Sequence, residues 1–198
     1  MKNCRNWLLG VAMSCLAAGA LAQGNPAEDM KRGQELMQQQ MKLMTPELVQ
    51  KANALSPEIK KFLMHVALRH ERRSDTLTLV QVMQEIMAEH HMIGAAIATD
   101  NGPMAADAAR RLALHRLPKG GMLPYLPIEK VTTEGLSVLP SMEAAVEGNA
   151  QKIAEAAEKG DMVAAARYYG DMTAGCVACH IHFRGQPGAT AYTPRLKQ

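Results

Sequence analysis

Apolar residues recur at three- and four-residue intervals through most of the chain, which is the period of an amphipathic helix. The longest such run lies between residues 75 and 98, where one inward face would carry Leu79, Met83, Ile86, His90, Ile93 and Ile97. Ser74 and Asp75 are candidate caps at its start, and a Gly-Pro break at residues 100–103 ends it. No stretch of useful length alternates apolar and polar residues as a half-buried strand does. The pattern therefore predicts an all-α protein.

Proline residues that follow capping residues mark three more helix starts, at Asn25-Pro26, Thr45-Pro46 and Ser56-Pro57. Later helices are expected over about 103–117, 134–159 and 161–184, with a long Pro- and Gly-rich connection over 118–135. Pro140 would kink the helix over 134–159 or delay its start. Residues 74–185 thus supply four helices, which predicts a four-helix bundle. Residues 23–73 form an additional helical segment that would cap the bundle, extend it or mediate dimer contacts, and residues 186–198 are expected to be a loose tail.

The first 22 residues have the pattern of a cleaved export signal. Lys2 and Arg5 precede an apolar segment over residues 7–16, and Ala20-Leu21-Ala22 fits the small-x-small site of a signal peptidase. The apolar segment is shorter than the ~20 residues of a spanning helix, which disfavours a membrane anchor. A lipoprotein linked at Cys15 is disfavoured too, because the usual aliphatic residue three positions upstream is missing. We therefore expect a periplasmic protein with no membrane span.

Composition narrows the class of protein. Hydrophobic residues make up 47% of the chain but aromatic residues only 4%, and there are 15 Met, which suits helix-on-helix packing. The 22 Lys and Arg nearly balance the 19 Asp and Glu, and no basic run with interleaved aromatics occurs, so a nucleic-acid partner is not expected. Paired carboxylates, a nucleophile elbow and a phosphate-binding loop are all missing from the sequence, so we do not expect an enzyme.

The motif that best indicates a chemical function is Cys176-Val177-Ala178-Cys179-His180. After cleavage of the leader these are the only cysteines, and a disulfide between them would close a tiny loop that staples nothing distant. C-x-x-C-H is the attachment signal for a c-type haem. On a helix, positions i, i+3 and i+4 share a face, so both thiols can reach the haem while the imidazole binds iron. A thioredoxin-like pair would need a βαβ setting, and a zinc site would need further ligands.

The ending of the motif resembles that of a known family. Residues 170–184 finish in C-x-x-C-H-x-x-aromatic-Arg, with Phe183 and Arg184 in the last two places, and are similar to the class II cytochromes c, the cytochrome c′ family. The resemblance covers residues 74–185 and implies a four-helix bundle with one covalent haem c, His180 on its iron and a possible homodimer through the first two bundle helices. It implies that Arg184 lies beside the proximal His180, near a propionate or a small ligand. The segment over 23–73 departs from the family.

The family has two branches, which differ at one residue of the first bundle helix. In the high-spin branch an aliphatic residue leaves the sixth iron position open to nitric oxide or carbon monoxide. In the low-spin branch a methionine binds the iron, and the protein carries electrons. Aligning Gly94 and the break at Gly102-Pro103 with the family places Met83 at this position. A packing role for Met83 stays open, and Met87, Met92, His90 and His91 are rival residues on the same helix.

We therefore expect a periplasmic carrier of single electrons that works with redox partner proteins. The alternatives are a gas-binding haem protein with an open sixth site, and a helical partner-binding protein in which C-x-x-C-H is accidental. His65, His70 and His115 are expected to be ordinary surface or packing residues.

Overall fold

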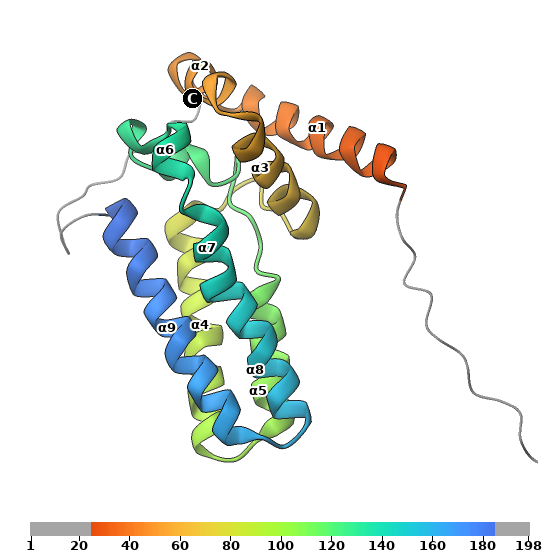
Figure 1. Ribbon diagram of the computed structural model, residues 1–198, viewed down its shortest axis with the longest axis vertical. Coiled ribbons are helices and arrows are strands. Elements are labelled where there is room, and N and C mark those ends of the chain that lie inside the picture. The colour runs from red at the N-terminus through yellow and green to blue at the C-terminus, as the bar shows by residue number, and fades with distance from the viewer. Residues whose placement is uncertain (1–24, 185–198) are drawn as a thin grey trace, which may run out of the picture.

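The computed structural model describes residues 25–184, and over this range the chain is helical without any β-strand (Figure 1). The predicted leader over 1–22 and the predicted tail over 186–198 lie outside the described residues. The α-helices are α1 (Pro26–Lys42), α2 (Pro46–Ala54), α3 (Pro57–Arg69), α4 (Leu79–Ala98), α5 (Gly102–Ala113), α6 (Thr133–Leu136), α7 (Leu139–Glu143), α8 (Asn149–Glu158) and α9 (Met162–Arg184). Two 3₁₀ turns lie at Leu123–Tyr125 and Ile128–Lys130. The prediction of an all-α protein is confirmed.

Most helix starts follow from their capping residues. The Asn25 side chain accepts a hydrogen bond from the Ala27 amide at 3.1 Å, and Ser56 accepts one from the Ile59 amide at 3.4 Å. The start predicted for the helix of residues 75–98 is wrong by four residues, because α4 begins at Leu79. Thr78 caps it instead, in a reciprocal capping box with Gln81. The Ser74 hydroxyl instead accepts a hydrogen bond from the Leu77 amide in the turn before the helix.

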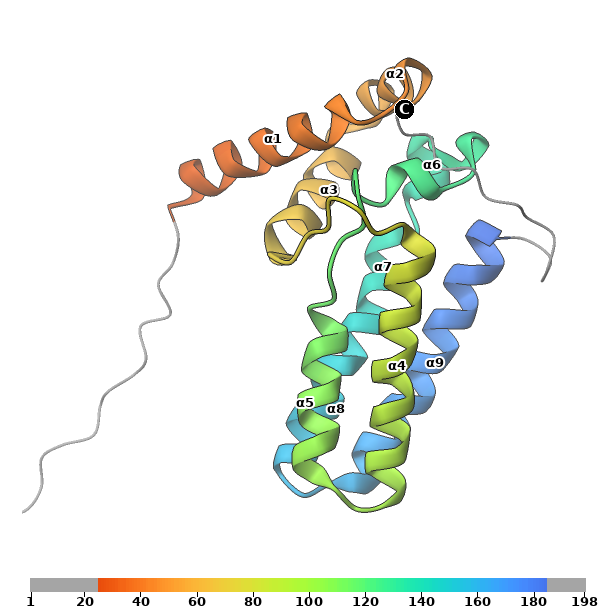
Figure 2. The same ribbon diagram turned by 180° about the vertical axis from the view of Figure 1, so that it is seen from behind.

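Four long helical segments run alongside one another, with α1 to α3 and α6 gathered across one end of them (Figures 1 and 2). The segments are α4, α5, α9 and the stretch from α7 to α8. Their shared core is rich in alanine, with Ile93, Leu112, Ile153 and Met172 as its largest buried side chains. Alanine lets helix backbones approach closely, so this core needs few bulky residues.

The N-terminal helices share a second core with the connection between α5 and α7. This core contains Met44, Leu48, Ile59, Leu63, Leu123 and Leu136. Phe183, near the end of α9, is buried in the same cluster, and Cys179 packs against it. The extra N-terminal segment and the C-terminal end of α9, where the C-x-x-C-H sequence lies, therefore belong to one apolar cluster.

The helix expected over 134–159 starts late, as Pro140 predicted, and it is not a regular α-helix throughout. The helix is interrupted after α6, restarts at α7 with Pro140 in its first turn, and passes through a π-helical segment at Ala144–Gly148 before α8. A proline fits a first turn, where its missing amide hydrogen is not needed. In the wider π-helical segment, the Asn149 side-chain amide donates to the Ala145 carbonyl at 2.8 Å.

Helix α9 approaches the π-helical segment so closely that only glycine fits at residue 175. A Cβ atom there would lie 2.9 Å from the Ala145 Cβ and 3.1 Å from the Ala145 carbonyl oxygen. We expect Gly175→Ala to lower the free energy of unfolding by about 1–3 kcal/mol, because the two segments must move apart. At Gly170, a Cβ would meet nothing within 4 Å. The matched Gly170→Ala change should stabilise α9 by about 0.5–1 kcal/mol. Urea unfolding of both variants measures the two changes in the free energy of unfolding. Equal changes would contradict the prediction.

Candidate functional site

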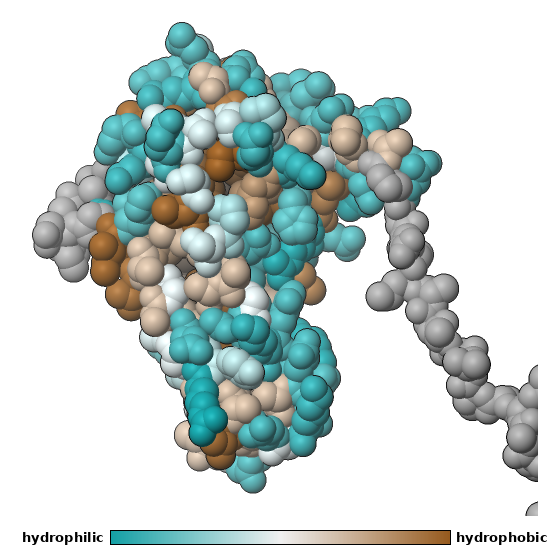
Figure 3. All heavy atoms as spheres, viewed as in Figure 1, coloured by the Kyte–Doolittle hydropathy of each residue, from teal (hydrophilic) through white to brown (hydrophobic). Residues whose placement is uncertain are grey.

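The three motif residues lie within one uninterrupted helix, α9. Asp161 caps this helix by accepting from the Ala164 amide at 2.9 Å. Cys176, Cys179 and His180 are all half-buried, and neither cysteine forms a disulfide. Their helical spacing puts the two thiols and the imidazole on neighbouring positions of one face. The buried side chains of Met172 and Phe183 flank them on the core side. The opposite face of α9 exposes Val177 and Ile181, in a region where Figure 3 shows hydrophobic side chains at the surface.

The surroundings keep these groups uncharged. Burial raises the pKa of the Cys176 thiol, and burial together with the neighbouring Cys176 raises the pKa of the Cys179 thiol. Burial, and next the charge of Arg184, lowers the pKa of His180. A neutral imidazole is the form that binds a metal ion. The site thus offers two free thiols and a neutral nitrogen ligand side by side.

Helices α4 and α9 run antiparallel, and polar contacts fix their register. The His90 Nε2 atom lies 2.9 Å from the Thr173 hydroxyl, and the Tyr169 hydroxyl lies 3.1 Å from His90 Nδ1. Gly94 lies one helical turn further along α4, and a Cβ atom at this residue would be only 2.7 Å from the Tyr169 hydroxyl oxygen. The two helices are therefore in contact from His90 to Gly94.

The register brings Met83 opposite His180. His180 lies seven residues beyond Thr173 (180 − 173), and Met83 lies seven residues before His90 (90 − 83). Seven residues are close to two turns, about 10.5 Å along each helix, so both residues stay on the faces that carry the His90–Thr173 contact. In Figures 1 and 2 the ribbons of α4 and α9 spread apart towards this end. Met83 is 36% exposed, although it lies on the face of α4 that is directed at α9.

The predicted inward face of α4 is only partly correct. Ile93 is fully buried, and Leu79, Ile86, His90 and Ile97 are half-buried, but Met83 is not buried. The fully buried residues that the pattern missed are Val82 and Ala96. The reason is that α4 has two neighbours. Ile93 and Ala96 belong to the shared core, while His90 and Gly94 contact α9 and Met83 lies on the same side of the helix as they do.

The rival ligands on α4 occupy other positions. His90 is held by Thr173 and Tyr169, two turns from Met83. Met92 is nine residues from Met83, which turns it to the opposite side of the helix. Beyond the motif, His182 bonds the Gly135 carbonyl at 3.0 Å through Nε2. Arg184, the last residue of α9, is exposed one turn beyond His180.

Protonation of His90 should weaken the contact between α4 and α9. Burial, and next the charge of His91, lowers the pKa of His90 below its ordinary value. The unfolded chain therefore binds this proton more readily, and stability falls as the pH drops below about 6.5. His90→Gln should reduce the difference in free energy of unfolding between pH 7.5 and pH 5.5, measured with urea. An unchanged difference would show that His90 does not contribute.

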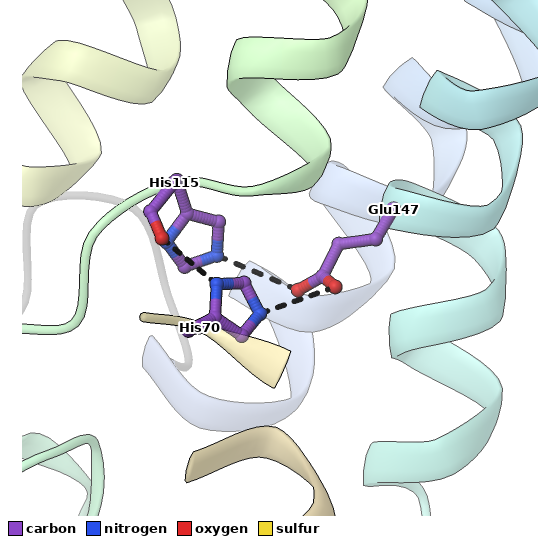
Figure 4. A group of neighbouring side chains, drawn as sticks. All are labelled: His70, His115 and Glu147. Atoms are coloured by element: carbon purple, nitrogen blue, oxygen red, sulfur yellow. Dashed lines mark hydrogen bonds and ion pairs between the residues drawn. The ribbon is translucent and has the colours of Figure 1, made fainter. Parts of the chain in front are cut away.

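A second group of polar side chains is buried where the ends of α3 and α5 meet the π-helical segment (Figure 4). His70 follows α3, His115 follows α5, and Glu147 lies in the π-helical segment. The Nε2 atoms of His70 and His115 lie 3.3 and 3.5 Å from the two oxygens of the Glu147 carboxylate. Arg69 also approaches Glu147, at 3.0 Å, and bonds Glu143. His70 is only 1% exposed, which agrees with the packing position expected for it, and it is also paired with the Glu147 carboxylate.

The charge state of Glu147 follows from this setting. Burial alone would raise its pKa, but the attraction of His115 and His70 outweighs burial and lowers the pKa to about 2. Sequence analysis missed this cluster because its residues lie in three distant segments with no shared motif. Only the packing of α3 and the α5 terminus against the π-helical segment brings them together.

No helix within residues 25–184 has the length and apolar character needed to cross a membrane. No protein-family profile, no curated protein and no solved structure matches the chain.

Proposed function

We propose that the chain is a c-type cytochrome with one covalent haem, held in a four-helix bundle of the cytochrome c′ kind formed by α4, α5, α7–α8 and α9. In this proposal it carries single electrons between partner proteins in the periplasm. The export pattern of residues 1–22 supports the compartment, and the C-x-x-C-H sequence supports the cofactor.

The observation that carries the proposal is the register of α4 against α9. It sets a methionine, Met83, opposite the motif imidazole, His180, at the end where the helices spread apart. A nitrogen ligand on one side and a thioether on the other are the ligand pair of electron-carrying c-type cytochromes, and the thioether raises the reduction potential.

The chemistry of the motif residues and their neighbours fits a covalently bound haem. Cys176 and Cys179 are free thiols one turn apart, as covalent attachment to a haem requires. His180 has a neutral imidazole to offer, and Met172 and Phe183 exclude water on the core side. Val80, Met83 and Met87 are exposed apolar side chains on the α9-directed side of α4, which an apolar macrocycle would cover. A bound haem supplies an iron that alternates between two oxidation states.

The second candidate function is gas binding at an open sixth iron position. The exposure of Met83 favours it, since a side chain that is 36% exposed is not held in place by its neighbours. If Met83 swings away, a small ligand such as nitric oxide or carbon monoxide can reach the face opposite His180. A helical protein with an accidental C-x-x-C-H sequence would bind no haem at all.

The absorption spectrum of the reduced periplasmic protein, recorded with and without carbon monoxide, separates these functions. We expect a low-spin spectrum that carbon monoxide changes only slowly, because it must displace the Met83 sulfur. An immediate change on adding the gas would support the gas-binding function. The absence of a haem spectrum would leave only the partner-binding function.

A further inference from the structure

The cluster of His70, His115 and Glu147 brings three metal-binding side chains to one point. One donor atom from each residue lies within 4.8 Å of the other two. The two closest separations, 3.3 and 3.5 Å, join imidazole nitrogens to carboxylate oxygens. Two ligands on a tetrahedral zinc ion, with bonds of roughly 2.0–2.1 Å, lie about 3.3–3.4 Å apart. The same separations are long for a hydrogen bond between a charged imidazole and a carboxylate, which is about 2.7–2.9 Å.

Hydrogen bonds to backbone carbonyls fix the tautomers of both imidazoles. His70 Nδ1 lies 2.8 Å from the His115 carbonyl oxygen, and His115 Nδ1 lies 2.8 Å from the Arg116 carbonyl oxygen. A carbonyl oxygen only accepts, so both Nδ1 atoms carry hydrogen. Each Nε2 atom then faces the Glu147 carboxylate, and in a neutral ring this atom carries the lone pair that a metal ion would bind. A second hydrogen bond from the far ring nitrogen to a carbonyl is the usual support of a metal-binding histidine.

Three buried polar atoms of the cluster and of the neighbouring Arg69 form no hydrogen bond. Within the described part of the chain these atoms are His70 Nε2, Glu147 Oε2 and Arg69 Nη2, although Arg69 Nη1 lies 3.0 Å from the same Glu147 oxygen, and the whole Glu147 residue is only 9% exposed. Two buried lone pairs that face each other repel unless a cation lies between them. Either protons on the imidazoles or a metal ion can supply that cation.

The net charge of the surroundings favours a cation. Arg69 contributes one positive charge, while Glu143 and Glu147, which it contacts, contribute two negative charges. With neutral imidazoles the group therefore has a net charge of −1. In addition, Glu147 lies in the π-helical segment, and such segments inside α-helices are frequent at functional sites.

We propose that His70, His115 and Glu147 bind a divalent transition-metal ion of the zinc class. The ion joins the end of α3, the end of α5 and the π-helical segment, and so fixes the N-terminal helices to the rest of the molecule. Three protein ligands leave a fourth position for water. The site is separate from the C-x-x-C-H sequence, and the proposal does not depend on haem binding.

The test is zinc binding by the full mature chain. The protein is dialysed against a chelator, then titrated with zinc chloride in a calorimeter, and its thermal midpoint is followed. We expect about one equivalent of zinc to bind and to raise the midpoint. Glu147→Gln and His115→Gln, which keep the side-chain size, should each weaken binding by at least about tenfold, the lower end of what losing even an outer-shell partner costs. The matched control is His65→Gln, because His65 is exposed and its imidazole is paired with Glu143 rather than with the three proposed ligands.

X-ray absorption at the zinc edge gives a second readout that does not rely on variants. We expect nitrogen and oxygen ligands with the imidazole pattern and no sulfur. Sulfur at the metal would place the zinc on Cys176 and Cys179 and overturn the proposal. Binding that persists unchanged in Glu147→Gln and His115→Gln would overturn it too. If the wild type binds no zinc, protons hold the cluster together and the proposal is wrong.

Discussion

Replacing Cys176 and Cys179 together with alanine should abolish covalent haem. The two thiols are the only attachment points that the motif provides, and both are free and half-buried on one face of α9. After acid–acetone extraction, wild-type protein should keep its haem colour and the double variant should lose it. Haem that stays with the double variant through extraction would contradict covalent attachment at these residues.

The same double substitution should destabilise the fold. A tightly bound group stabilises the folded state by about 3–4 kcal/mol or more, and this contribution is lost when the group is not retained. For a chain of this size, that loss lowers the thermal midpoint by roughly 6–16 °C. Val177→Ala is the matched control, because Val177 lies between the two cysteines and is exposed. It should keep both haem and stability.

Met83→Ala should convert a low-spin haem into a high-spin one. If the Met83 sulfur binds the iron, the oxidised wild type has a weak sulfur-to-iron charge-transfer band in the far red, and carbon monoxide binds slowly. Removing the sulfur opens the sixth position, so the band should vanish and carbon monoxide should bind rapidly. Stopped-flow absorption measures both changes in one experiment.

Two other methionines of α4 serve as controls for Met83→Ala. Met92 lies on the opposite side of the helix, so Met92→Ala should leave the spectrum and the binding rate unchanged. Met87 lies one turn from Met83, at the level of Cys176 rather than His180, and its replacement should have a much smaller effect than that of Met83. A wild type that is already high-spin and binds carbon monoxide rapidly would make gas binding the function.

Local signals in the sequence predicted much of the fold. The Asn25 and Ser56 caps, the break before Gly102 and the extent of α9 all follow from neighbouring residues, and the structure confirms them. The start of α4 was misplaced because Ser74 and Thr78 are both competent caps. Only Thr78 has Gln81 three residues later to complete the box.

Features that depend on contacts between distant segments could not be predicted in this way. The π-helical segment in the helix expected over 134–159 lies where α9 packs Gly175 against Ala145, 30 residues away (175 − 145). The burial of His70 likewise depends on His115 and Glu147, which periodicity does not relate to it. The position of Met83 depends on both kinds of information: periodicity predicted that it lies on one face of α4, and the His90–Thr173 contact indicated that this face is directed at α9.

The central claim is that this chain carries one covalently bound haem, and the pyridine haemochrome spectrum of the purified periplasmic protein tests it most directly. The spectrum depends on whether the haem vinyl groups have been saturated by thioether bonds. We predict the band position of a haem with two thioether bonds, at one haem per chain. A haemochrome with unsaturated vinyl groups, or none, would contradict the claim.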